Sequence, residues 1–191
     1  MKQKIIFTVF TLCLFNISCK NKEDKKDESK EGVFPVLSYI KSQVAHVDTS
    51  LYKITKLVSV DSTWDTSYIK REEFRTYAAD FLELPDLSDK TNAALYNESK
   101  FFDASLNRAI ITYSPKDKSQ QIQREEVTIE PGAGEPDKVK NVIVDKLVVA
   151  KDGTTVTKRL LWVVDESFQV TTIIQRNGLP DSTQTTKITW E

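Results

Sequence analysis

The feature that most constrains the fold of this chain is a series of short alternating segments between residues 96 and 190. In each segment, apolar and polar side chains alternate with the period of two that is typical of a β-strand. Asp152-Gly153 and Asn177-Gly178 each separate two such segments, and both dipeptides tolerate the positive φ angles of hairpin turns. Short links between consecutive strands force antiparallel neighbours, so the pattern predicts a meander sheet. The expected strands are residues 96–102, 107–114, 121–130, 138–150, 154–165, 167–176 and 182–190.

Ahead of these segments, residues 35–47 are predicted to form an amphipathic helix. Apolar side chains recur at spacings of three and four between Phe34 and Val47, and Pro35 suits the first turn of a helix. Residues 51–60 are rich in β-branched side chains and are predicted to form a strand. We expect that strand to end in the turn-prone sequence Asp61-Ser62-Thr63.

A second helix is predicted over residues 70–82, where the apolar side chains follow helical spacing. Ser67 is the candidate N-cap of this helix, and Pro85 stops it. The predicted fold class is therefore α+β, with N-terminal helices packed on a long twisted antiparallel β-meander sheet of about six to seven strands.

Both faces of the predicted sheet are partly apolar near its centre. In residues 154–165, Leu160 and Trp162 point to one face while Leu161 and Val163 point to the other. Two arrangements explain this pattern. Helices cover one face while the sheet curls over the other, or the curl encloses a ligand cavity as in open half-barrels. Core packing on both faces is the simpler explanation.

The start of the chain has the pattern of a secretory signal. Residues 1–4 form a short basic segment. Residues 5–17 form a mainly apolar segment that is too short to span a bilayer. The sequence Asn16-Ile17-Ser18-Cys19 resembles the lipobox at which bacterial lipoproteins are cleaved and acylated, although Asn16 stands where most lipoboxes carry leucine. Over about its first thirty residues, the chain thus resembles the small uncharacterised lipoproteins of Bacteroidota, and the resemblance assigns the rest of the chain to no characterised family. This resemblance implies a signal peptide at residues 1–18 and acyl chains such as palmitate on Cys19, which would attach the protein to a membrane.

A charged segment follows the cysteine. Residues 20–31 include five basic and five acidic side chains and no apolar one, so residues 19–31 are predicted to be the lipidated cysteine and a disordered linker of at most ~40 Å. Lys22-Glu23-Asp24 resembles the acidic sorting cluster of surface-exposed lipoproteins of Bacteroidota. The two resemblances together imply a lipid anchor in the outer membrane, on its periplasmic face or at the cell surface.

Residues 32–191 have the composition of a single folded domain. The chain's two cysteines are Cys13 and Cys19, so the mature domain is expected to have neither a free thiol nor a disulfide. The whole chain has 27 basic and 28 acidic side chains, a balance that predicts no attraction to nucleic acid.

Patterns of known catalytic and binding sites are missing from the sequence. His46 is the chain's only histidine, which excludes a histidine metal cluster, and it suits the C-terminal dipole of the first predicted helix. Gly132-Ala133-Gly134-Glu135 lacks the third glycine of a dinucleotide fingerprint and is expected to be a connection.

The acidic residues also form no pattern typical of a catalytic pair or a metal site. Glu72 and Glu73 are adjacent on the second predicted helix, so they do not face each other as a glycosidase pair does. Positions in turns and helix caps explain four aspartates better than a calcium-binding loop does. They are Asp61, Asp65, Asp86 and Asp89. We therefore expect a protein that is not an enzyme, with no catalytic residue, metal or cofactor.

Three tryptophans are the remaining candidates for a contact site. Trp162 and Trp190 lie in predicted strands and are expected to be buried. Trp64 lies in the polar sequence 62–67, which we interpret as a turn, so it is the candidate partner contact.

Two functions remain compatible with these observations. The first is a non-enzymatic cell-envelope lipoprotein, tethered through Cys19, whose domain binds an envelope protein or supports an assembly. The alternative is a carrier of lipid or another apolar ligand in a half-barrel cavity, and its signature is an apolar cavity of several hundred Å³. An enzyme that works through carboxylates alone is a third, weaker hypothesis.

Overall fold

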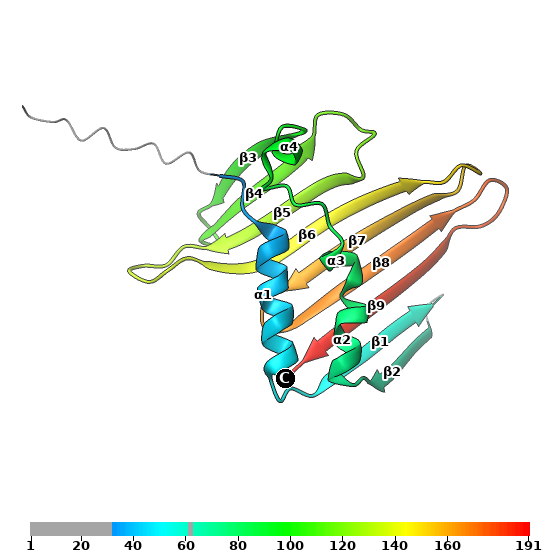
Figure 1. Cartoon of the computed structure of the whole chain (residues 1–191), viewed down its shortest axis with the longest axis horizontal. Helices are drawn as coiled ribbons and strands as arrows, with labels where there is room; N and C mark the ends of the chain where they lie inside the picture. Colours follow the sequence, from blue (N-terminus) through cyan, green and yellow to red (C-terminus); the bar gives the residue numbers. More distant parts are fainter. Residues whose placement is uncertain (1–31, 61–62) are drawn as a thin grey trace, which may run out of the picture. The chain divides into compact units, whose positions relative to one another are not determined.

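The computed structural model describes residues 32–60 and 63–191, which form one nine-stranded sheet and four helices (Figure 1). The predicted signal peptide, Cys19, the predicted linker and Asp61 lie outside the described residues. The strands are β1 (Ile54–Val60), β2 (Thr63–Tyr68), β3 (Tyr96–Asp103), β4 (Arg108–Pro115), β5 (Ile122–Glu130), β6 (Lys138–Val149), β7 (Thr155–Val163), β8 (Ser167–Gln175) and β9 (Ser182–Trp190). The helices are α1 (Val36–Thr49), α2 (Arg71–Tyr77), α3 (Ala79–Leu82) and α4 (Lys90–Ala93). Among the described residues, no helix has the length and hydrophobicity needed to cross a membrane.

The sheet is antiparallel throughout, as predicted, and its strand order is β2-β1-β9-β8-β7-β6-β5-β4-β3. Strands β3 to β9 are the predicted meander of seven. The strand count of six to seven is wrong, because β1 pairs with β9 and β2 pairs with β1 in the same sheet. The sequence of β2, TWDTSY, has no apolar alternation, and the prediction of a turn over residues 62–67 is wrong. An edge strand with solvent on both faces does not need that alternation.

The turns follow the predicted chemistry. Gly153 and Gly178 adopt φ angles of 82° and 75°, the left-handed region that glycine enters without strain. Both lie in the predicted hairpin connections, β6 to β7 and β8 to β9. The segment Gly132–Glu135 is a connection between β5 and β6, as expected.

The helices are only partly N-terminal, which corrects the prediction. α1 precedes every strand, whereas α2, α3 and α4 lie between β2 and β3 in the chain. The helix predicted over residues 70–82 is two helices, because Ala78 leaves helical geometry with φ −83° and ψ 0°. Ser67 is not its cap, since that residue lies within β2. The Glu73 carboxylate instead accepts a hydrogen bond from the backbone N–H of Lys70 at 2.8 Å.

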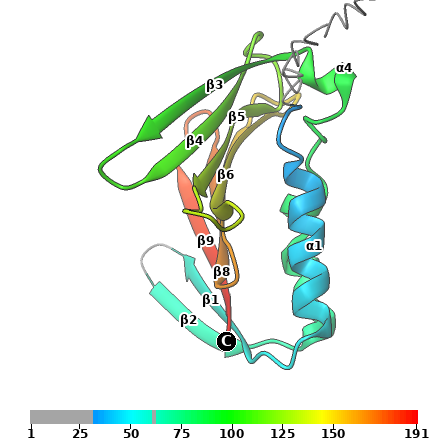
Figure 2. The same cartoon turned by 90° about the vertical axis from the view of Figure 1, so that its left-hand side faces the viewer.

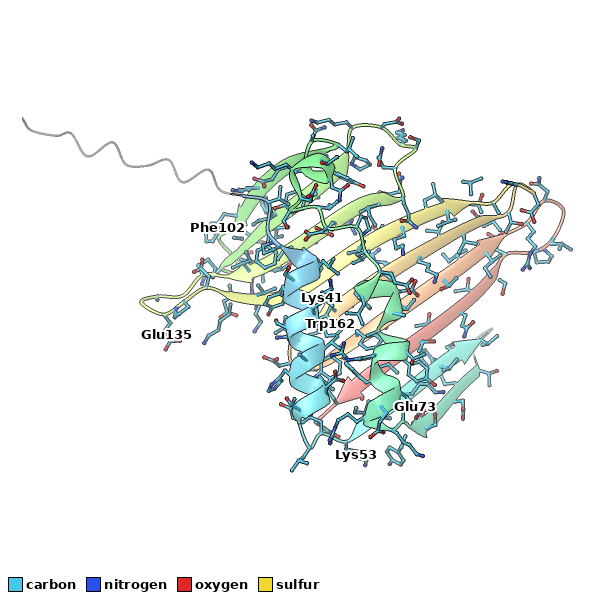
Figure 3. All side chains as sticks on the ribbon, in the orientation of Figure 1. Lys41, Lys53, Glu73, Phe102, Glu135 and Trp162 are labelled. Atoms are coloured by element: carbon cyan, nitrogen blue, oxygen red, sulfur yellow. The ribbon has the colours of Figure 1, made fainter. Side chains whose placement is uncertain are left out.

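α1 lies along one face of the sheet, and Figure 2 shows this layer edge-on. Its buried side chains, Val36, Ile40, Val44 and Val47, follow the spacing of an amphipathic helix. They join a core cluster that also includes Trp162, labelled in Figure 3, and Trp190, and both tryptophans are buried as predicted.

An aromatic cluster joins α2 and α3 to the centre of the sheet. Phe74 of α2 lies 5.3 Å from Trp190, and Phe81 of α3 lies 5.2 Å from Trp162, both edge to face. Trp162 stacks on Phe168 at 5.2 Å. The hydrophobic core cluster lies within residues 32–191, which form one compact unit, so this segment is able to fold on its own.

Candidate interaction surface

The face of the sheet opposite α1 has no helix over it in the described part of the chain (Figure 2). We call it the helix-free face. The hairpins β1–β2 and β3–β4, at the two edges of the sheet, extend toward this side, away from α1. The helix-free face is therefore a broad surface with a hairpin at each edge.

Trp64 lies on this face, in edge strand β2. It is 57% exposed and sits opposite Ser59 of β1. Tyr68, also exposed, points to the same face four residues further on, and the Nζ of Lys53 lies 4.5 Å from the centre of its ring. The predicted contact residue is thus exposed and on an open face, but it is in a strand rather than a turn.

The strand register aligns Trp64 with a row of polar side chains, which we call the polar row. Across seven strands, its members are Trp64, Ser59, Thr185, Thr171, Arg159, Asp145 and Arg124. At a strand spacing of about 4.8 Å, the row spans roughly 29 Å. The hydroxyls of Thr171 and Thr185 are 3.2 Å apart and hydrogen-bonded.

The charged end of the polar row is an ion-pair network. Arg124 Nε donates to Asp145 at 3.0 Å, and the Nη1 atom of the same guanidinium lies 3.2 Å from Glu126. Arg159 Nε approaches Asp145 at 3.9 Å. Two arginines and two carboxylates balance in charge, so this end offers hydrogen-bonding groups without a strong net field.

Half-buried aliphatic side chains lie beside the polar row on the same face. They are Leu57, Ile143, Leu161 and Ile173. The helix-free face therefore mixes aliphatic, hydroxyl and paired charged groups.

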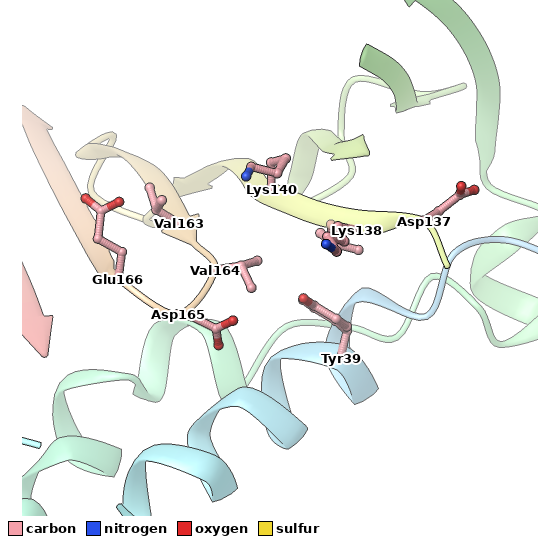
Figure 4. Close-up of a pocket in the computed structure, with 9 residues that line it drawn as sticks. Tyr39, Asp137, Lys138, Lys140, Val163, Val164, Asp165 and Glu166 are labelled. Carbon is pink, nitrogen blue, oxygen red and sulfur yellow. The ribbon is translucent and has the colours of Figure 1, made fainter. Parts of the chain in front are cut away.

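A pocket of about 490 Å³ lies where α1 approaches the β5–β6 and β7–β8 connections. Figure 4 shows Tyr39 of α1 opposite Lys138 and Asp165 in this pocket. Burial, followed by the nearby charge of Asp165, raises the pKa of Tyr39, so the phenol stays neutral. Asp137, Lys140 and Glu166 add further charges to the lining. This charged lining differs from the apolar cavity that a lipid carrier needs.

Glu125 of β5 is a buried acid that the sequence analysis did not single out. It is 1% exposed, on the helix-covered face of the sheet, and its Oε1 has no hydrogen-bond partner among the described residues. Burial, followed by the nearby charge of Asp86, raises its pKa to about 8. The available signal was the alternation of β5, which puts Glu125 on the same face as Val127 and Ile129.

The other candidate residues take structural positions. His46 lies in the last turn of α1, with Nε2 3.3 Å from the Tyr52 hydroxyl oxygen. Asp86 accepts hydrogen bonds from Ser88, and Asp89 caps α4 through the N–H of Thr91. Asp65 is exposed on β2.

Glu72 and Glu73 lie in the first turn of α2, where they suit the helix dipole. Over residues 32–60 and 63–191, no three His, Cys, Asp or Glu side chains gather in a way that could hold a metal ion.

Comparison of the chain with protein-family models, curated proteins and solved structures finds no match.

Proposed function

We propose that this chain is a lipid-anchored protein of the bacterial cell envelope whose folded domain binds a partner protein and has no enzymatic activity. The anchor is Cys19, acylated after removal of residues 1–18, and the membrane is the outer membrane. The lipobox-like sequence Asn16–Cys19 supports the anchor.

The observation that best supports partner binding is the polar row on the helix-free face. Trp64 offers a large exposed aromatic group at one end, where tryptophan is a frequent anchor of protein interfaces. The hydroxyls and ion pairs along the row offer directional hydrogen bonds, which a protein partner satisfies and an acyl chain does not.

Photo-crosslinking in the native cells tests this proposal. A photoreactive residue replaces Trp64 in the full chain, and a matched variant carries it at Lys41, an exposed position of α1 on the helix-covered side. We expect one defined protein adduct at position 64 and none at position 41. Equal labelling at both positions, or no adduct at position 64, would contradict partner binding at this face.

Mass spectrometry of the same protein, extracted from its own membranes, tests the anchor separately. The expected N-terminal peptide begins at Cys19 and has the added mass of acyl chains. An N-terminal peptide that still contains residues 1–18, or an unmodified Cys19, contradicts the anchor without affecting the crosslinking result.

The alternative function is a carrier of lipid or another apolar ligand. It is favoured by one observation, the half-buried aliphatic side chains Leu57, Ile143, Leu161 and Ile173 on the helix-free face. Native mass spectrometry of residues 32–191 released from the membrane-extracted protein distinguishes the two functions. A reproducible lipid-sized adduct favours the carrier, and a bare domain or a protein complex favours the interaction module.

A further inference from the structure

The tip of the β3–β4 hairpin exposes three large apolar side chains within six residues. Phe101 is 64% exposed, Phe102 is 53% exposed and Leu106, in the turn, is 66% exposed. Apolar side chains concentrated on a protruding tip indicate a contact surface, because exposing them to water is unfavourable.

The two phenylalanines point in opposite directions. Phe101 pairs with Ile110 on the helix-free face, and Phe102 pairs with Ala109 on the opposite face of the hairpin. A flat protein partner covers one face of a hairpin and leaves the other in water. An occupant that surrounds the tip covers both, and the interfacial region of a lipid bilayer is such an occupant.

The turn between the strands holds the tip in one shape. The Asp103 carboxylate accepts hydrogen bonds from the N–H and the hydroxyl of Ser105, at 2.9 and 2.6 Å, and from the N–H of Leu106 at 3.2 Å. Asn107 then adopts a positive φ of 50°. The carboxylate at the tip is therefore bonded within the turn, which holds the backbone of Leu106 while its side chain is exposed.

The start of the described chain is hydrogen-bonded to β4, one strand of this hairpin. The backbone N–H of Phe34 donates a hydrogen bond of 2.8 Å to the Tyr113 hydroxyl on β4. Tyr113 is five residues from Arg108 at the tip, or about 17 Å along the strand. Cys19 precedes Gly32 by 13 residues, a reach of at most ~45 Å. An anchor on Cys19 therefore holds this hairpin within reach of the membrane.

We propose that the tip of the β3–β4 hairpin inserts into the interfacial region of the bilayer through Phe101, Phe102 and Leu106, as a second membrane contact beside the acylated Cys19. This inference rests on the proposed function, because the anchor keeps the hairpin close to the membrane.

The cations nearest the tip are ion-paired, Lys100 with Glu98 and Arg108 with Glu130. Insertion therefore depends on apolar contact and occurs on zwitterionic lipid.

The test uses residues 32–191 with an N-terminal histidine tag, bound to phosphatidylcholine vesicles that contain a small fraction of nickel-chelating lipid. This segment has no cysteine, so Ala104→Cys gives a single site at the tip for an environment-sensitive fluorophore. The matched control is Lys151→Cys, in the β6–β7 turn at the other end of the sheet. Both positions are exposed.

We expect fluorescence at position 104 to rise severalfold on vesicles and to be quenched by spin-labelled lipid, while position 151 stays unchanged. In the Ala104→Cys chain, the further substitutions Phe101→Ser and Phe102→Ser are expected to abolish both the rise in fluorescence and its quenching, because most of the inserted apolar surface is lost. Both substitutions are at exposed positions, so the domain stays folded, which circular dichroism checks.

Two results overturn the proposal. One is unchanged fluorescence at position 104 on chains shown by flotation to be vesicle-bound. The other is a rise that depends on protein concentration and occurs without vesicles, which assigns the tip to a second copy of the chain. Because the nickel tether replaces Cys19, neither result bears on acylation, which the mass of the cell-extracted protein decides.

Discussion

Glu125 is the residue whose environment departs most from what its chemistry favours. An ionised carboxylate in an apolar interior loses its hydration, so the neutral acid is favoured and the pKa rises to about 8. Its surroundings include Tyr96 and Tyr113, whose own pKa values are raised, that of Tyr113 to about 12 and mainly by burial. Neither phenol nor Asp86 supplies a positive charge, so this group of residues offers no stabilisation to the ionised form.

Glu125 is therefore predicted to make folding stability depend on pH. The carboxyl titrates near 4.5 in the unfolded chain and near 8 in the folded chain, so between these values the folded state binds more protons. The free energy of unfolding falls as pH rises through this range, by about 1.4 kcal/mol for each unit of pKa difference. Glu125→Gln is expected to remove this loss, as measured by urea unfolding at about pH 5 and about pH 9.

Glu126→Gln is the control for this prediction. It removes one negative charge at the next residue, on the helix-free face, where Arg124 pairs with it. We expect it to keep the pH dependence of the wild type. If Glu125→Gln and Glu126→Gln behave alike, the pH dependence does not come from the buried carboxyl.

At the scale of elements, short helices depend on the sheet for their stability. α3 has four residues and α2 has seven, both too short to persist alone in water. Phe74 and Phe81 fix them by packing their rings against Trp162, Phe168 and Trp190.

Removing one of these rings is predicted to destabilise the whole domain. Phe81→Ala should lower the free energy of unfolding by about 3–5 kcal/mol, since Phe81 is fully buried and its loss leaves a cavity. Phe102→Ala deletes an equal ring from an exposed position and should change it by less than about 0.5 kcal/mol. Urea unfolding of residues 32–191 measures both, and equal effects would contradict the assigned core.

The edge strands are predicted to be the least protected part of the sheet. β2 and β3 each have one neighbouring strand and are mostly exposed, whereas β7 lies between β6 and β8 over a buried core. Amide hydrogen exchange should be fastest in β2 and β3 and slowest in β7. Slow exchange in β2 would show that another chain or segment covers that edge.

At the scale of the molecule, residues 32–191 form a sheet with helices on one face and an open face on the other (Figure 2). The described residues contain a hydrophobic core of their own, so residues 32–191 are predicted to form a stable domain without residues 1–31. Residues 32–191 and the full chain in detergent should unfold at the same temperature by circular dichroism. A clearly lower midpoint for the shorter chain would show that residues before Gly32 stabilise the fold.

Alternation and turn chemistry predicted strands β3 to β9 closely, because β4 to β9 each place one face against the core and the strands end near residues that favour turns. Of β3, only Tyr96 is buried. The same rule failed for β2, whose six residues have no core to face. It also predicts residues 70–82 as one helix, because the apolar spacing continues through Ala78, where the backbone leaves helical geometry and separates α2 from α3.

The sequence by itself determined the antiparallel meander, the first helix and the burial of Trp162 and Trp190, since these follow from local periodicity. Tertiary structure alone decided which face the helices cover, that β1 closes onto β9, and that Trp64 aligns with Arg124 across seven strands. It also decided the hydrogen bond that the backbone N–H of Phe34 donates to the Tyr113 hydroxyl. These features depend on contacts between residues far apart in the chain, which local patterns do not encode.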